Sequence, residues 1–185
     1  MGDLFLNIGA TALFNLVIQF ALYPYLNKTL GEEMYGTALF MLSLVAIASG
    51  SCGTAANYSR LVSEKTLRPS NGDYNLFLLV GGMLCAAVGL FYLWQIKLLT
   101  PITAILFAAL LIVTAFRYYS DVEFKLKTSF VRYFFFYLAI SVGYLLGLLV
   151  YRKTNQWMTA LLTGEIFGLV YAAFASRIYR HPLLR

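Results

Sequence analysis

The stretch LFLLVGGMLCAAVGLFYLWQI, residues 76–96, contains no charged side chain. A helix rises about 1.5 Å per residue, so this stretch can cross a hydrocarbon core about 30 Å thick. The runs of this kind occupy approximately residues 4–26, 36–59, 76–96, 101–119, 130–151 and 157–176. They lack the two-residue alternation of outer-membrane barrel strands. We therefore expect an all-α integral membrane protein with six transmembrane helices.

Composition supports the same class. Hydrophobic residues make up 61% of the 185, charged residues 12%, and the mean hydropathy is +0.74. A soluble domain of this length is far more polar. The net charge of +6 is explained by basic residues at one membrane surface, so we expect a lipid bilayer and no nucleic acid as partner.

Basic residues also predict the orientation of the helices, because Lys and Arg concentrate in cytoplasmic segments. If the N-terminus is inside, only four of the 14 basic residues fall outside, namely Lys28, Lys97, Arg152 and Lys153. We therefore expect both termini to be cytoplasmic. The first run ends in Tyr-Pro-Tyr rather than a small-residue cleavage site, so we expect it to be retained as a helix and not removed as a signal peptide.

Two of the predicted helices carry polar rows. In the first, the row consists of Asn7, Thr11, Asn15 and Gln19; in the fifth, it consists of Tyr133, Tyr137, Ser141 and Tyr144. Spacings of three and four residues place each row on one helix face. Such a face either forms hydrogen bonds to a neighbouring helix or lines a hydrated cavity. The fifth helix also carries Gly143 and Gly147 in a G-x-x-x-G pattern, which suits close helix packing.

Glu165 is the acidic side chain that lies deepest in a predicted span. An ionised glutamate there is costly unless it is paired or hydrated. Three interpretations are open: a proton- or cation-responsive group, a neutral hydrogen-bonded glutamate, or a span whose boundary is misplaced. Gln19, Tyr144 and Glu165 lie at a similar depth from the outer ends of their helices, so we expect that they can meet.

Three arginines fall at the inner ends of predicted spans: Arg60, Arg117 and Arg132. Together they would form a basic cytoplasmic mouth able to hold phosphate oxygens. Alternatively, each extends separately to lipid headgroups. The segment that follows Arg117 has mixed charge and is consistent with a short interfacial helix.

Nothing in the sequence favours an enzyme, a metal or a cofactor. No zinc-protease, nucleophile-elbow or phosphate-loop motif is present, and Cys52 and Cys85 lack metal-ligand spacing and fall inside predicted helices. The acids Glu64, Asp73, Asp121 and Glu123 are scattered among bases, which is typical of solvated loops.

The segment LFNLVIQFALYPYLNKTLGEEMYGTALFMLSLVAIASGSCGTAANYSR resembles the opening helices of bacterial polysaccharide flippases. In that family an Asn-bearing first helix leads through a loop of the form L-G-x-x-x-Y-G, here Leu30, Gly31, Tyr35 and Gly36. The stretches RYYSDVEFKLKTSFVRYFFFYLAISVGYLLGLLV and LLTGEIFGLVYAAF are similar to later helices of the same family. The family belongs to the multidrug/oligosaccharidyl-lipid/polysaccharide exporter superfamily.

The resemblance implies a MATE-like lobe that flips an undecaprenyl-diphosphate-linked oligosaccharide across the bacterial cytoplasmic membrane by ion-coupled alternating access. The arginines would then hold the diphosphate, the polar rows would contact sugars, and Glu165 would couple protonation to the conformational change. We expect activity to be lost on Glu165→Gln or Asn15→Leu.

Members of the family have two six-helix lobes, whereas this chain has six predicted helices. It is therefore expected to be a fragment, a truncated product, or a half-transporter that pairs with a second lobe. The alternatives to a flippase are a six-helix scaffold of a glycan-assembly complex, a multidrug exporter lobe and, third, a membrane enzyme.

Overall fold

The computed structural model describes residues 2–63, 70–126 and 129–176, and their regular structure is helical throughout. The elements are α1 (Gly2–Leu16), a π-helical turn η1 (Val17–Leu22), α2 (Tyr23–Leu30), α3 (Glu32–Ser63), α4 (Asn71–Gln95), α5 (Pro101–Leu126), α6 (Phe130–Thr154) and α7 (Met158–Ala175). Because α1, η1 and α2 are continuous, the described chain contains six helices long and apolar enough to span a membrane. The chain is a multi-pass membrane protein.

Local sequence signals set where the helices begin and end. Ser70 and Asp73 form a capping box at the start of α4, so two amide groups of the first turn have acceptors. Gly31 has a φ of 75° and ends α2, which allows the chain to turn into α3 after one residue. Asn155 ends α6 in the left-handed conformation.

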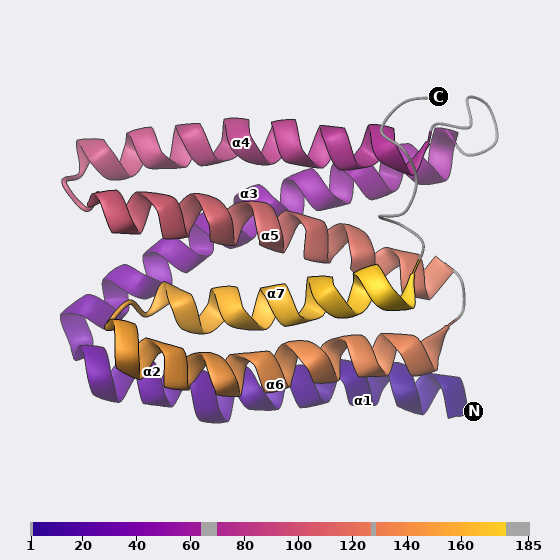
Figure 1. Ribbon diagram of the computed structural model, residues 1–185, viewed down its shortest axis with the longest axis horizontal. Helices are drawn as coiled ribbons and strands as arrows, with labels where there is room; N and C mark the ends of the chain where they lie inside the picture. The colour runs from indigo at the N-terminus through magenta and orange to yellow at the C-terminus, as the bar shows by residue number, and fades with distance from the viewer. Residues whose placement is uncertain (1, 64–69, 127–128, 177–185) are drawn as a thin grey trace.

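Helix α5 lies in the middle of the bundle (Figure 1). On one side it contacts α3 and α4, and on the other α7 and α6, while α1 packs on the far side of α6. Helix α3 crosses the bundle diagonally, from α2 at one end to the start of α4 at the other. Helix α1 begins and α7 ends at the same end of the bundle.

Helices α6 and α7 make the closest contact in the bundle, and glycine makes it possible. A Cβ atom on Gly143 would lie 2.8 Å from the Cα of Gly164, and one on Gly147 would collide with the backbone of Ala160. The prediction that Gly143 and Gly147 allow close helix packing is confirmed. Because α7 approaches so closely, its side chains reach the boundary between α5 and α6.

Five of the predicted spans are too short at charged residues. The first span continues to Leu30, the second covers Glu32–Ser63, the third begins at Asn71, α5 continues from the expected end at Tyr119 to Leu126, and α6 continues to Thr154. The expectation of a separate interfacial helix after Arg117 is therefore wrong. The helix continues because its charges have partners: Lys125 Nζ lies 2.7 Å from Asp121 Oδ2 within α5, and Glu123 pairs with Arg60 of α3.

Candidate functional site

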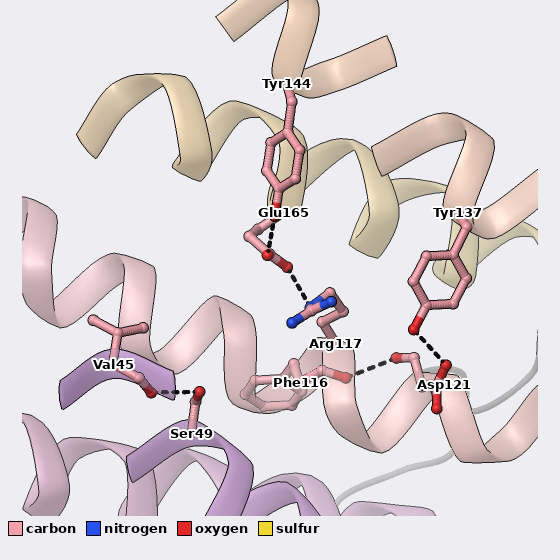
Figure 2. Close-up of polar contacts among 9 residues, drawn as sticks. Val45, Ser49, Phe116, Arg117, Asp121, Tyr137, Tyr144 and Glu165 are labelled. Carbon is pink, nitrogen blue, oxygen red and sulfur yellow. Dashed lines mark hydrogen bonds and ion pairs between the residues drawn. The ribbon is translucent and has the colours of Figure 1, made fainter. Parts of the chain in front are cut away.

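A row of charged side chains on α5 faces the row of tyrosines on α6. The α5 row is Arg117, Asp121 and Lys125, and the α6 row is Tyr144, Tyr137 and Tyr133. Residues four or seven apart lie on one face of a helix, so each row forms a line of side chains along its own helix. Since α5 and α6 run in opposite directions, the rows meet in opposite order. Figure 2 shows Tyr137 in contact with Asp121, and Tyr144 and Arg117 each in contact with Glu165. The expected row on the fifth span is thus in contact with charges.

Glu165 of α7 lies at the buried end of this double row and is 3% exposed. The hydroxyl of Tyr144 donates to Glu165 Oε1 at 2.6 Å, and Arg117 Nε lies 2.9 Å from Glu165 Oε2 (Figure 2). The two carboxylate oxygens therefore have different partners on different helices. This cluster joins α5, α6 and α7 through one buried acid.

The next contacts along the row involve Asp121. The hydroxyl of Tyr137 donates to Asp121 Oδ1 at 2.8 Å, and Lys125 Nζ donates to Asp121 Oδ2 at 2.7 Å. The Lys125 ammonium lies 5.1 Å from the centroid of the Tyr133 ring, within cation–π range. Exposure rises along this row from Glu165 at 3% to the Lys125 side chain at 43%, so the row runs from the buried centre to the surface.

Phe14 is the contribution of α1 to the cluster. Its ring lies 5.1 Å from that of Tyr137 and 5.8 Å from that of Tyr144, and the Arg117 guanidinium lies 5.4 Å from its centroid. The ring of Tyr118 is 4.7 Å from the same guanidinium. Arg117 thus lies near two aromatic rings as well as beside an acid, and these contacts restrict its position.

A second ion pair lies on the opposite side of α5. Arg60 of α3 pairs with Glu123, which is 1% exposed, and the Arg60 guanidinium also lies 5.7 Å from the centroid of the Tyr119 ring. The prediction that Glu123 belongs to a solvated loop is therefore wrong: the carboxylate is buried because a cation is buried with it. Glu64 lies outside the described residues.

The three arginines expected to form one mouth have separate partners. Arg117 pairs with Glu165, Arg60 pairs with Glu123, and Arg132 is exposed and donates to the carbonyl oxygen of Ala175 at 3.1 Å. Arg117 also lies nine residues before the end of α5 rather than at the helix end. Two of the three charges are thus neutralised by buried acids, and only Arg132 is exposed.

The meeting of Tyr144 with Glu165 is confirmed, but Gln19 is exposed and makes no hydrogen bond to either among the described residues. In the same row, Asn7 and Thr11 are half-buried and Asn15 is exposed. Thr11 donates to the carbonyl of Asn7 in its own helix at 3.2 Å. The row therefore turns from a partly covered face toward an open one.

Exposed polar residues within the spans are concentrated on the first two. Away from the ends of α4, α5, α6 and α7, the exposed residues described are apolar or tyrosine, as expected for contact with lipid tails. By contrast, α1 with η1 exposes Asn15 and Gln19, and α3 exposes Ser43, Ser51 and Thr54. We call this set of five residues the polar face; its two parts lie on helices whose described residues are not in contact with each other.

The site also contains residues that the sequence did not predict for it. Asp121 and Lys125 were expected in a loop, and Phe14 was not singled out. One signal for the first two is present in the sequence: Arg117, Asp121 and Lys125 alternate in sign at intervals of four, the pattern of a paired helix face. The α6 row is also less uniform than expected, because Ser141 donates at 2.8 Å to the carbonyl of Tyr137 in its own helix.

The chemistry of the cluster is that of charge pairing. The acid forms an ion pair with the base and accepts a hydrogen bond from the phenol. Among residues 2–63, 70–126 and 129–176, no group of three or more His, Cys, Asp and Glu side chains could hold a metal ion. The role of Glu165 in ion coupling stays a prediction. No family model matches the chain, and neither the search of curated proteins nor the search of solved structures found a match.

Proposed function

We propose that this chain is one six-helix lobe of a transporter that flips a lipid-linked oligosaccharide across the bacterial cytoplasmic membrane, with both termini inside. The observation that carries the proposal is the polar face, and within it the amides of Asn15 and Gln19. Both amides are exposed near the middle of the first span, and neither has a hydrogen bond to another described residue. A pathway lined by this face would give both amides partners.

The cost of burying an amide in lipid supports this reading. An amide without a hydrogen-bond partner in hydrocarbon costs several kcal/mol, so two of them in the middle of a span are not expected to face lipid tails. The exposed serines are different. Ser43 donates to the carbonyl of Leu39 at 2.9 Å and Ser51 to that of Ile47 at 2.7 Å, so neither needs an external partner.

The π-helical turn η1 is a second supporting feature. The amide of Tyr23 donates to the carbonyl of Ile18, five residues earlier, so one extra residue is fitted into the turn that contains Gln19. Turns of this kind are often found at functional sites, because they redirect side chains without breaking the helix. Here the turn begins two residues after Asn15 and contains Gln19, so it changes the direction of Gln19 relative to Asn15.

The substrate class is proposed from the resemblance to polysaccharide flippases and from chemistry. Amide side chains both donate and accept hydrogen bonds, as sugar hydroxyls do, which suits Asn15 and Gln19 to a glycan. Of the three arginines at the predicted inner ends, Arg132 is the one suited to a diphosphate, since Arg60 and Arg117 have acids as partners. A second six-helix lobe would close the pathway opposite the polar face, because alternating access needs two bodies that move against each other.

The first prediction concerns water at the polar face. In a background in which Cys52 and Cys85 are serine, Asn15→Cys and Gln19→Cys are expected to react with a membrane-impermeant maleimide in intact membranes. Val88→Cys and Ile166→Cys, at exposed apolar positions of α4 and α7, are the matched controls and are expected to stay unlabelled. Labelling is read by a mass shift on a gel. Equal labelling at all four positions, or none at Asn15 and Gln19, would contradict a hydrated face.

The second prediction concerns flipping itself. Vesicles of the membrane in which the chain is expressed are expected to translocate a fluorescent undecaprenyl-diphosphate-linked oligosaccharide faster than vesicles without it. Replacing both Asn15 and Gln19 with leucine is expected to lower the rate by about tenfold or more, because a glycan loses two hydrogen-bond partners. Gln95→Leu removes an exposed amide at the end of α4, outside the polar face; it is the control and is expected to leave the rate unchanged. A chain that labels at the polar face and has a second lobe present, but does not flip the lipid, favours the scaffold alternative.

A further inference from the structure

Two cysteines meet at the contact of α3 with α4, away from the charged cluster. The Sγ atoms of Cys52 and Cys85 lie 3.6 Å apart, and both thiols are free. Cys52 is buried, whereas Cys85 is half-buried, and Cys52 also packs over Gly81, one turn before Cys85. The two sulfurs would need to move about 1.5 Å closer to reach the bond length of a disulfide.

A cavity of about 320 Å³ leads to the same pair. It lies between α3, α4 and α5, and Cys85 forms part of its wall together with small residues, Ala48 and Gly89, and apolar ones that include Val88. The residues that line it carry no charge. Three of them, Ile47, Leu84 and Val88, are 65–71% exposed on the outer surface of the spans, so the cavity opens toward lipid. Its volume is in the range that holds a small organic ligand.

We propose that Cys52 and Cys85 form an oxidisable dithiol that a lipid-soluble quinone reaches from the bilayer through this cavity. Each thiol gives up its hydrogen, a bond forms between the two sulfurs, and the quinone takes up two electrons and two protons to become the quinol. The product is a disulfide that ties α3 to α4. Two separate observations support this proposal: the two sulfurs are in contact, and an apolar cavity leads to Cys85. Neither observation depends on the transport proposal.

The route distinguishes classes of oxidant. A quinone carries no charge and partitions into hydrocarbon, whereas oxidised glutathione is charged and would have to enter the membrane to reach Cys85. The structure offers a charged oxidant no polar access on this side, because the described cavity wall is apolar. Selectivity for an apolar oxidant is therefore the signature of the site.

The test uses the reduced, purified chain in lipid nanodiscs. A fully substituted short-chain benzoquinone, which cannot add to thiols at the ring, is expected to remove both titratable thiols and to yield one quinol per protein. Oxidised glutathione at the same concentration is expected to leave both thiols titratable. Wild-type protein that keeps both thiols in the presence of the quinone, or that reacts equally fast with glutathione disulfide, would overturn the proposal.

Variants separate the thiol pair from the route. Cys52→Ser and Cys85→Ser each leave one thiol and are expected to yield no quinol. Ala48→Leu fills the cavity and is expected to slow oxidation by about tenfold, whereas Val88→Ala widens it and is expected not to slow it. Circular dichroism of each variant checks that helix content is kept. An unchanged rate in a folded Ala48→Leu protein would overturn the route, and the wild-type comparison of the two oxidants does not depend on any variant.

Discussion

Replacing Arg117 with leucine is expected to lower the free energy of unfolding by about 3–5 kcal/mol, because the carboxylate of Glu165 is then left buried without its cation. Glu165 is 3% exposed and has Arg117 on one oxygen and Tyr144 on the other. The substitution also removes the contacts of the guanidinium with the rings of Phe14 and Tyr118. Unfolding in mixed micelles with an increasing fraction of dodecyl sulfate measures the loss.

The double substitution, Arg117→Leu with Glu165→Leu, tests the physical reason. It removes the buried charge together with its partner, and replacing a whole buried ion pair with apolar residues is often neutral or stabilising. What remains is the hydroxyl of Tyr144 without an acceptor, so the expected loss falls to about 1–3 kcal/mol. If the double variant is as unstable as Arg117→Leu, or if the two single losses add, the pair does not stabilise α5 against α7 as described.

Arg132→Leu is the matched control for charge. Arg132 is exposed on α6 and donates one hydrogen bond, at 3.1 Å, to the carbonyl of Ala175. Its loss is expected to cost about 1 kcal/mol or less. A similar cost for Arg117→Leu and Arg132→Leu would mean that burial of the pair has no energetic consequence.

Much of the fold could be predicted from the sequence because lipid imposes a simple rule. Backbone groups in hydrocarbon must bond within their own segment, so an apolar run of sufficient length is a helix. The prediction failed where charged residues continue a helix, as in the last turns of α5. Counting apolar residues treats the first charge as the end of a span, whereas a charge with a buried partner extends it. Arg117 was placed at the membrane surface for this reason.

The candidate site was predicted in part. Glu165 stands out as an acid in an apolar run, and similar depth brought Tyr144 to it, which the structure confirms. Depth alone does not say which way a side chain points, and Gln19 points to the open face instead. The pairing of Arg60 with Glu123 joins residues 63 positions apart, and only the crossing of α3 over α5 brings them together. That crossing has no local signal in the sequence.

The contact between α6 and α7 provides the second large effect. Gly147→Ala is expected to lower the free energy of unfolding by about 3 kcal/mol, at the upper end of the range for overpacking, because the new methyl group meets backbone that cannot rotate away. The atoms it would meet are the carbonyl oxygen and Cα of Ala160. The two helices would have to separate, which would also move Glu165 on α7 relative to Tyr144 on α6. Unfolding in mixed micelles measures the loss.

Gly36→Ala is the matched control for Gly147→Ala. The substitution is the same, but the change in the free energy of unfolding is expected to have the opposite sign. Gly36 lies within α3, is exposed, and has no atom within 4 Å of the position that a Cβ would occupy. Alanine is a better helix former than glycine, so this variant is expected to be more stable by about 0.4–1 kcal/mol. Opposite signs for the two substitutions would show that the contact at Gly147, and not the loss of glycine flexibility, sets the cost. Two losses of similar size would contradict the close approach of α6 and α7, and with it the position of α7 that brings Glu165 to Arg117.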